Sequence, residues 1–414
     1  MAAALIQLSA ELEEPEPGIT ANHVSKWERG ARTPSPYYRP RLCLVFDATQ
    51  HELGFDSTPT LNGAIGKLAR RRLQHRSLSN GAGGGSPTAL SATAFPHVDL
   101  ERMATTMTYL WPVDRALLDG LQRAGKELVR RADIEAPDTI VPDLRAYRDG
   151  LSALLSRSQS PDAASHLQVL ASETSRNIGW LSDHVHQWPD TYANFALAES
   201  LAREAGSGSQ LALVLINKSN LYAERAAMPA DFGPAIALAD AASVAVGPDA
   251  PGGLRAWILA ERATYAAAIG DEITASRNLD YAYRLAAAAP REMNLFSDYD
   301  SSWLDGYQGA VALRLRPDAA IDIYEAVLRR TDARLTWERT SALGHLAEAQ
   351  AARGERDLDH VCALLHEMIA LAQATGDRRG VELARRLRQR HLARAAASQG
   401  VRRLDELLRS THSR

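Results

Sequence analysis

The chain has 414 residues, with 47 Lys and Arg against 50 Asp and Glu, which gives a net charge of −3. Hydrophobic residues make up 45% of the sequence and no long apolar run occurs, so wholesale disorder and a membrane-spanning protein are excluded. The N-terminus lacks the pattern of a secretory leader, and Cys43 and Cys362 form no disulfide framework. We therefore expect a cytoplasmic protein of two or more domains, or of repeats.

The charge is unevenly distributed along the chain. Residues 18–76 carry ten basic and four acidic side chains, a balance of +6, and residues 1–17 add four acidic side chains, which gives +2 for residues 1–76. Residues 77–414 have a balance of −5. Nearly all the basic residues are Arg, which we attribute to a GC-rich genome rather than to phosphate binding. The basic N-terminal part is the candidate for contact with nucleic acid, because the local charge matters more than the total.

The N-terminal element of interest spans residues 19–30, with the sequence ITANHVSKWERG. Thr20 is a natural N-cap whose hydroxyl can accept a backbone N–H, and Gly30 is a natural stop. Val24 and Trp27 lie three residues apart and face one way, while polar residues face elsewhere. A short amphipathic helix with a donor-rich outer face suits the major groove of DNA.

Val24, Trp27, Glu28 and Gly30 form a Val-x-x-Trp-Glu-x-Gly string. This string resembles the recognition helix of Cro/lambda-repressor-type helix-turn-helix proteins, the Xre family. The resemblance continues as far as residue 55 and implies a helix-turn-helix DNA-binding domain over residues 1–56. It also implies a core made of Val24, Trp27, Leu42, Leu44, Val45, Leu53 and Phe55.

The resemblance gives each polar residue of this domain a role on double-stranded DNA. Asn22 is placed to bond an adenine edge and Lys26 to reach guanine acceptors, with a solvated face as the alternative for both. The remaining candidates are placed to contact phosphates and to position the domain. They are Thr20, His23, Ser25, Arg29, Arg32 and Tyr38. A homodimer is expected because such domains usually bind two half-sites one helical turn apart.

The start of the chain departs from this family. Such domains normally begin with a helix before the element that carries Leu5, Leu8 and Leu12, and the sequence has no residues left for it. A long connection, EEPEPGI, also separates this element from the expected recognition helix. We expect the natural reading frame to begin upstream of Met1.

A stretch rich in Gly and Ser divides the chain. Residues 77–98 contain no charged side chain and show no periodicity, which indicates a flexible linker. A basic run, KLARRRLQHR, precedes it at residues 67–76. We assign residues 57–98 to the basic segment and linker, and residues 99–414 to a C-terminal domain.

The C-terminal domain is predicted to be almost wholly helical. Apolar residues recur at spacings of three and four, and no stretch offers convincing strand alternation. Short breaks, such as Gly206 to Gly208 and Gly270-Asp271, imply antiparallel helical hairpins. The expected helices include residues 114–132, 161–185, 210–227, 254–269 and 340–353.

Two hairpins share a spacing of small residues. With Gly270-Asp271 at the turn, Ala263 falls in the first helix, and Ala275 and Ala282 flank Leu279 in the second. Residues 320–328 repeat the second-helix pattern, which resembles tetratricopeptide (TPR) repeats at a spacing longer than the usual period of about 34 residues. We therefore expect an all-α fold with a C-terminal TPR-like α-solenoid, as in actinobacterial regulators of the Xre family.

Motifs for catalysis are absent from the sequence. It contains no phosphate-binding loop, nucleophile elbow or metalloprotease helix, so we expect neither an enzyme nor a cofactor. The pair His184 and His186 has no third ligand at a usable spacing, and we expect a surface or helix-end role rather than a metal. The basic segment 377–394 is expected to be a terminal helix that caps the solenoid.

A ligand site is expected on the solenoid, for a peptide or a small molecule. Asn217 and Asn220 could share the inner face of one helix and clamp a peptide backbone, or be surface residues. Tyr265, Trp303 and Tyr307 could line the same groove or pack between repeats. The sequence thus predicts a sequence-specific DNA-binding transcriptional regulator with a sensor or dimerisation domain. The alternative is a TPR-like protein- or peptide-binding scaffold whose incomplete head no longer binds DNA.

Overall fold

The computed structural model describes residues 5, 19–28, 34–35, 38, 42, 103, 113–156, 159–226, 228–288, 303–353 and 357–411. Within these ranges the regular elements are α-helices and two short 3-10 helices, with no strand, which confirms the predicted all-α class. The chain forms two compact units, residues 1–86 and 87–414. The boundary falls inside segment 57–98, which lies outside the described residues.

In the N-terminal unit, α2 (Ala21–Glu28) is present where the recognition helix was expected. It begins directly after Thr20, whose carbonyl oxygen accepts the N–H of His23 at 3.0 Å. Trp27 and Tyr38 pack against a small apolar cluster. The buried members of this cluster are Leu5, Ile19, Val24 and Leu42.

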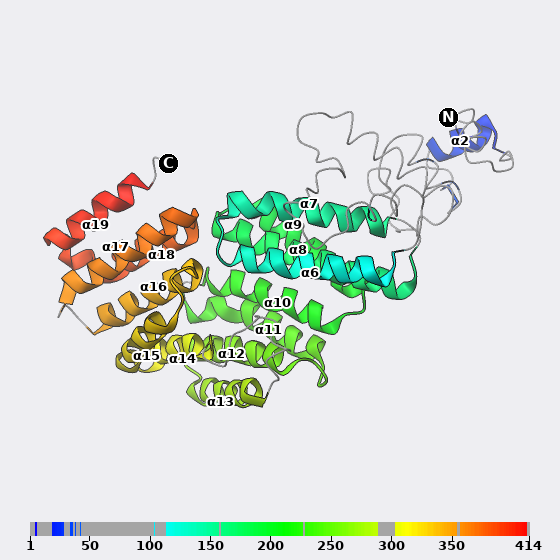
Figure 1. The fold of residues 1–414 in the computed structure, drawn as a ribbon. Helices are drawn as coiled ribbons and strands as arrows, with labels where there is room; N and C mark the ends of the chain where they lie inside the picture. The colour runs from blue at the N-terminus through cyan, green and yellow to red at the C-terminus, as the bar shows by residue number, and fades with distance from the viewer. Residues whose placement is uncertain are drawn as a thin grey trace. The chain divides into compact units, whose positions relative to one another are not determined.

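The C-terminal unit is a succession of helices, most of which follow one another after short turns (Figure 1). The first are α6 (Arg115–Ala132), α7 (Pro137–Leu155), α8 (Pro161–His184), α9 (Trp188–Glu204), α10 (Gly208–Ala223), η2 (Pro229–Phe232), α11 (Gly233–Val246), α12 (Gly252–Ala268) and α13 (Glu272–Ala288). They are followed by α14 (Leu304–Leu315), α15 (Pro317–Arg330), α16 (Thr336–Ala352), α17 (Leu358–Thr375), α18 (Arg378–His391), η6 (Ala393–Ala395) and α19 (Gln399–Ser410).

Local sequence explains where these helices begin and end. Several start with Pro in the first turn, where the missing N–H would have no partner in any case. Gly206 and Gly270 have φ of 65° and 84°, a conformation that other residues rarely adopt, and each ends a helix at a predicted break. Polar side chains directly before a helix accept a backbone N–H from its first turn at seven helix starts, namely at Asp114, Ser160, Ser207, Asp271, Asp357, Asp377 and Ser398.

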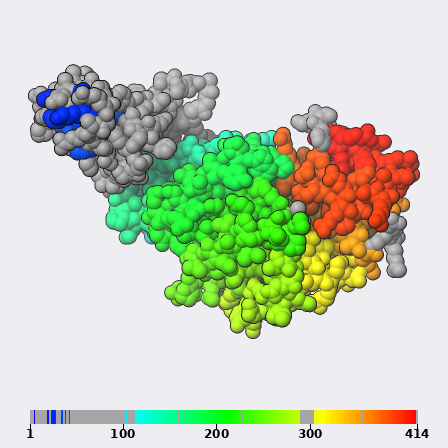
Figure 2. Space-filling model, turned by 180° about the vertical axis from the view of Figure 1, so that it is seen from behind, coloured from blue at the N-terminus to red at the C-terminus, as the bar shows by residue number. Residues whose placement is uncertain are grey.

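Neighbouring helices pack in antiparallel pairs, among them α8 with α9, α10 with α11, α12 with α13, α14 with α15 and α16 with α17. Figure 2 shows this order on the surface, where the colour passes from green through yellow and orange to red. The first helices of successive pairs also contact one another, in the order α8, α10, α12, α14, α16 and α18. Because α18 contacts α8 in turn, these six helices form a closed ring of neighbours, which we call the inner ring.

Small side chains permit the close approach of paired helices, as the spacing in the sequence predicts. Ala263, Ala275 and Ala282 are fully buried, and Leu279 is buried beside them. At the C-terminal end the prediction was wrong, because the basic segment 377–394 is not the last helix. α18 lies in the inner ring, and α19 follows it and packs on α17.

A search of the described helices for one that is both long and apolar enough to cross a membrane found none.

Candidate functional site

The expected DNA-contacting side chains of α2 lie at and beyond its first turn. His23 and Lys26 are exposed, and Ser25 is half-buried. Thr20 Oγ1 lies 3.0 Å from His23 Nδ1, and the Thr20 N–H donates to the same nitrogen at 3.3 Å. The Thr20 hydroxyl therefore pairs with the His23 imidazole and not, as was expected, with a backbone N–H. His23 is the third residue of α2, and a side chain at that position can reach back to the residue before the helix.

Tyr38 was expected to contact phosphate, and its ring packs against Trp27 with 5.1 Å between ring centroids. Trp27 is partly buried, as expected of a core residue rather than a platform for bases. The remaining predicted residues of this domain lie outside the described positions, or have side chains that do. They are Asn22, Arg29, Arg32, Leu44, Val45, Leu53 and Phe55.

The inner ring of the C-terminal unit encloses a cavity of about 1110 Å³. All six ring helices contribute to its lining, together with residues of α15, α17 and η2. The volume lies slightly above the roughly 300–1,000 Å³ typical of small-molecule sites. Seven aromatic side chains line it: Trp180, Phe232, Tyr265, Trp303, Tyr307, Tyr324 and Trp337. A cavity of this size and lining suits a large amphipathic ligand.

One wall of the cavity is a saturated hydrogen-bond network around Glu261 on α12. Glu261 Oε1 accepts bonds from Asn220 Nδ2 at 2.8 Å, from Tyr307 Oη at 2.9 Å and from Trp257 Nε1 at 3.0 Å. Burial raises the pKa of Glu261, while these hydrogen bonds oppose the rise. Tyr265 Oη in turn donates to Asn220 Oδ1. The network joins α10, α12 and α14 and gives this wall a fixed shape.

The two asparagines singled out in the sequence therefore have different surroundings. Asn220 lines the cavity, but its amide is committed to Glu261 and Tyr265. Asn217 is buried, donates to the Leu213 carbonyl at 3.1 Å and accepts from Arg176 at 3.3 Å. Neither is the surface residue that the simpler interpretation proposed, and the pair does not present two free amides to a ligand.

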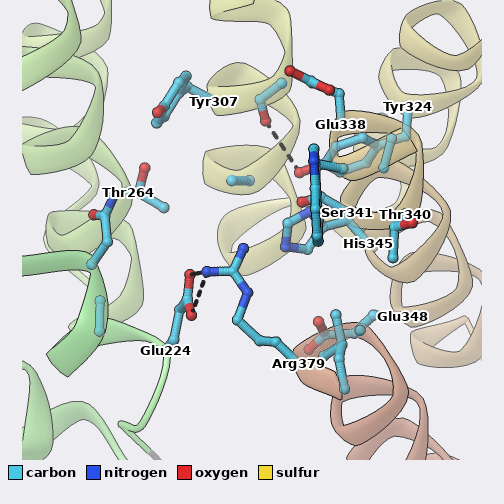
Figure 3. Close-up of a pocket in the computed structure, with 18 of the residues that line it drawn as sticks. Glu224, Thr264, Tyr307, Tyr324, Glu338, Thr340, Ser341, His345, Glu348 and Arg379 are labelled. Atoms are coloured by element: carbon cyan, nitrogen blue, oxygen red, sulfur yellow. Dashed lines mark hydrogen bonds and ion pairs between the residues drawn. The ribbon is translucent and has the colours of Figure 1, made fainter. Parts of the chain in front are cut away.

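Charged residues join the ends of α8 and α10 to the start of α18. Arg379 on α18 donates from one nitrogen to both carboxylate oxygens of Glu224, at 2.7 and 2.9 Å (Figure 3). The same guanidinium lies 3.6 Å from Asp183, which also accepts a hydrogen bond from Arg225 at 3.0 Å. These contacts close the inner ring between its first and last helices.

His184 lies beneath this junction and is buried, so the prediction of a surface role was wrong and that of a helix-end role was right. Its Nδ1 lies 3.2 Å from Asp377 Oδ1, and its ring packs against Trp180 and Trp337 at centroid distances of 4.5 and 4.2 Å. Burial and the nearby Arg379 lower the pKa of His184 to about 4, against the effect of Asp377. The imidazole is therefore neutral at pH 7 and donates to the Asp377 carboxylate.

The opposite wall is formed by α16, where Glu338, Ser341, His345 and Glu348 follow one another at spacings of three and four (Figure 3). Glu348 is paired with Arg314 at 2.9 Å. Within the described part of the chain, the other three have neither an ion pair nor a hydrogen bond to another side chain. We call Glu338, Ser341 and His345 the α16 stripe. It gives the cavity an edge of polar groups without partners.

Neither the α16 stripe nor Arg379 was predicted as a site from the sequence. A polar residue every three or four positions was visible in an Ala-rich helix, but such a pattern ordinarily marks a solvated face. For Tyr265, Trp303 and Tyr307 the sequence allows two interpretations, groove lining or packing between repeats. In the structure they line the cavity and also pack in an apolar cluster.

Metal-binding geometry was searched for in the described residues, and no group of three or more His, Cys, Asp or Glu side chains fit to hold an ion was found there. His186 is turned away from His184 by a φ of 59° and stacks on Trp188.

Comparison of the chain with protein-family models, with curated proteins and with solved structures gave no match.

Proposed function

We propose that the protein is a sequence-specific DNA-binding transcriptional regulator whose C-terminal unit, a TPR-like solenoid, binds an effector ligand. The observation that carries the proposal is the cavity inside the inner ring, with three polar side chains for which the described part of the chain offers no partner. Glu338 and Ser341 are exposed to the cavity and His345 is half-buried, so their polar groups are accessible to a ligand. A few polar groups that converge on a cavity with an aromatic lining are typical of a binding site.

The DNA-binding half of the proposal is supported by α2 and its surroundings. The helix buries Val24 and exposes His23 and Lys26, which is the division of faces that a groove-binding helix requires. Residues 18–76 carry a charge balance of +6, which favours a polyanion. The Val-x-x-Trp-Glu-x-Gly string resembles that of the Xre family and gives this helix its proposed role.

Selection of bound DNA from a random pool by the full chain tests the regulator proposal. We expect one enriched sequence, with two related half-sites about one helical turn apart if the protein binds as a dimer. Affinity for that sequence should fall linearly with the salt concentration on a double-logarithmic plot, because binding releases counterions. Light scattering of the free protein and of the complex gives the number of chains bound.

The second candidate function is a protein- or peptide-binding scaffold with an inactive N-terminal unit. The observation that favours it is the size of the cavity, which exceeds that of most small-molecule sites. The same selection distinguishes the two functions. A pool that stays unenriched, with no salt-dependent binding to any duplex, would contradict the regulator and leave the scaffold.

A further inference from the structure

The α16 stripe lies along one wall of the cavity, opposite Tyr307 and Thr264 (Figure 3). Glu338, Ser341 and His345 occupy successive turns of one helix, so their carboxyl, hydroxyl and imidazole groups form a row. Burial lowers the pKa of His345, and its ring stacks on Tyr324 at 5.2 Å between centroids. The row therefore presents hydrogen-bond acceptors at each of its three positions around neutral pH.

Glu338 is the residue of this row whose charge lacks compensation. Glu338 is exposed to the cavity, and the loss of part of its hydration to the surrounding protein raises its pKa to about 7. The charge that acts on it is that of Asp133, another carboxylate, whose own pKa burial raises to about 6. Asp133 does not line the cavity and has the charge of Arg176 acting on it, so Glu338 is the carboxyl group that is open to a ligand. A cation beside Glu338 would favour its charged form.

Most arginines that line the cavity are already committed elsewhere. Arg379 is paired with Glu224, Arg314 with Glu348, and Arg330 with Asp305. Arg390 also lies 3.8 Å from Glu348. Arg386 lines the cavity from α18, but the charge acting on Glu338 is that of Asp133. The protein's described residues thus supply no counter-ion to Glu338.

We propose that the cavity binds an amphipathic organic cation whose ammonium or guanidinium group pairs with Glu338. Ser341 and His345 accept further hydrogen bonds from the same end of the ligand. The apolar body packs on the aromatic lining, where the partly exposed rings of Trp303 and Tyr307 also favour positive charge. This assignment deepens the proposed function, because it rests on the cavity being the ligand site and names the chemistry of its ligand.

A purely structural role for Glu338 makes a different prediction. Glu338 lies in the first turn of α16, where a carboxylate is favoured by the helix dipole. If that were its role, Glu338→Gln would lower the stability slightly and leave ligand binding unchanged. Binding and stability therefore have to be measured on the same variants.

Two fluorescent probes that differ in one charge test the proposal on the full chain. Dansylcadaverine carries a primary ammonium on a dansyl body, and its N-acetyl derivative keeps the body without the charge. At pH 8, where Glu338 is mostly ionised, we expect dansylcadaverine to bind about tenfold more tightly than the acetylated probe. Glu338→Gln should remove this preference. Glu325→Gln, which changes an exposed carboxylate on α15 outside the cavity, should preserve it.

The outcomes separate this inference from the proposed function. Equal binding of both probes to the natural chain, or a preference that survives Glu338→Gln, would overturn the cation site while leaving a ligand-binding cavity. Binding of neither probe would overturn both. Thermal unfolding of each variant identifies loss of binding caused by loss of folding. If Glu338→Gln does not fold, Ser341→Ala provides the second test, because it removes one hydrogen-bond acceptor of the α16 stripe. It should weaken the binding of dansylcadaverine more than that of the acetylated probe.

Discussion

Arg379 on α18 and Glu224 at the end of α10 form an ion pair across 155 residues of sequence. One guanidinium nitrogen lies 2.7 and 2.9 Å from the two carboxylate oxygens, and 3.6 Å from Asp183 at the end of α8. A single side chain of the last ring helix thus holds the ends of two earlier helices. The closure of the inner ring, and with it the shape of the cavity, depends on this contact.

Arg379→Gln should therefore destabilise the C-terminal unit. The substitution leaves Glu224 and Asp183 close together with less compensating charge, and we expect the free energy of unfolding to fall by about 1–3 kcal/mol. Urea denaturation followed by circular dichroism measures it. Arg262→Gln is the matched control, since Arg262 pairs with Asp240 at 2.8 Å on the exposed surface and such pairs contribute about 0–1 kcal/mol. Equal effects of the two substitutions would contradict the role given to Arg379.

The stability of the unit should depend on pH through His184. Its pKa of about 4 in the folded chain lies below the usual value of about 6.5, so the unfolded chain binds the proton first as the pH falls. Stability contributed by this residue is therefore present at pH 7 and is lost between about pH 6.5 and pH 4. Asp183, Asp377 and Arg379 are the charged groups that act on the ring.

His184→Gln isolates this contribution. Glu338 and Asp133, whose pKa values are raised, act with the opposite sign, because the folded chain binds their protons first. Their effect is common to both proteins and cancels in the comparison. Between pH 7 and pH 4.5 we expect the natural chain to lose about 2 kcal/mol more stability than the variant. Parallel stability profiles would show that His184 does not titrate as the buried geometry requires.

Gly309 on α14 should not tolerate a larger residue. A Cβ at this position would lie 2.7 to 3.0 Å from ring atoms of Tyr324, which is buried between α14 and α15. Gly309→Ala should lower the free energy of unfolding by about 1–3 kcal/mol through overpacking. Gly306→Ala on the same helix meets nothing within 4 Å and should raise it by up to about 1 kcal/mol through helix propensity. Thermal unfolding of the two variants should therefore show shifts of the melting temperature in opposite directions.

How far the sequence predicts this fold depends on how local each signal is. The breaks at Gly206 and Gly270 and the buried row around Ala275 follow from turn chemistry and spacing, and the structure has them in place. The start of α16 was expected at residue 340 and lies at Thr336. Trp337 extends the helix because it is buried in the cluster formed by α6, α7 and α8, a contact that no local pattern reveals.

The candidate site was harder to predict for the same reason. The sequence leaves two interpretations for Tyr265 and Tyr307, groove lining or packing between repeats, and the structure places both in the cavity lining. Glu338 and Arg379 are ordinary surface residues by composition, and they acquire a role only because the inner ring closes on itself. Closure depends on contacts between helices far apart in the sequence. No local pattern in a single sequence indicates which distant helices are in contact.

The last prediction concerns the proposed recognition helix, α2. Lys26 is exposed on α2, one turn beyond Asn22, and we expect it to contact base edges in the major groove. Lys26→Ala should reduce the difference in binding free energy between the selected sequence and random DNA by about 1–3 kcal/mol. Arg32→Ala, at a position proposed to contact phosphate, should weaken binding to both by a similar factor and reduce the salt dependence.

Fluorescence anisotropy with both duplexes, over a series of salt concentrations, measures these effects. Lys126→Ala, which removes an exposed lysine from α6 in the C-terminal unit, is the matched control and should leave both affinities unchanged. If Lys26→Ala behaved as Lys126→Ala does, α2 would not lie in the groove. A uniform loss on both duplexes would instead move Lys26 from the bases to the phosphates, since only contacts to base edges distinguish one sequence from another.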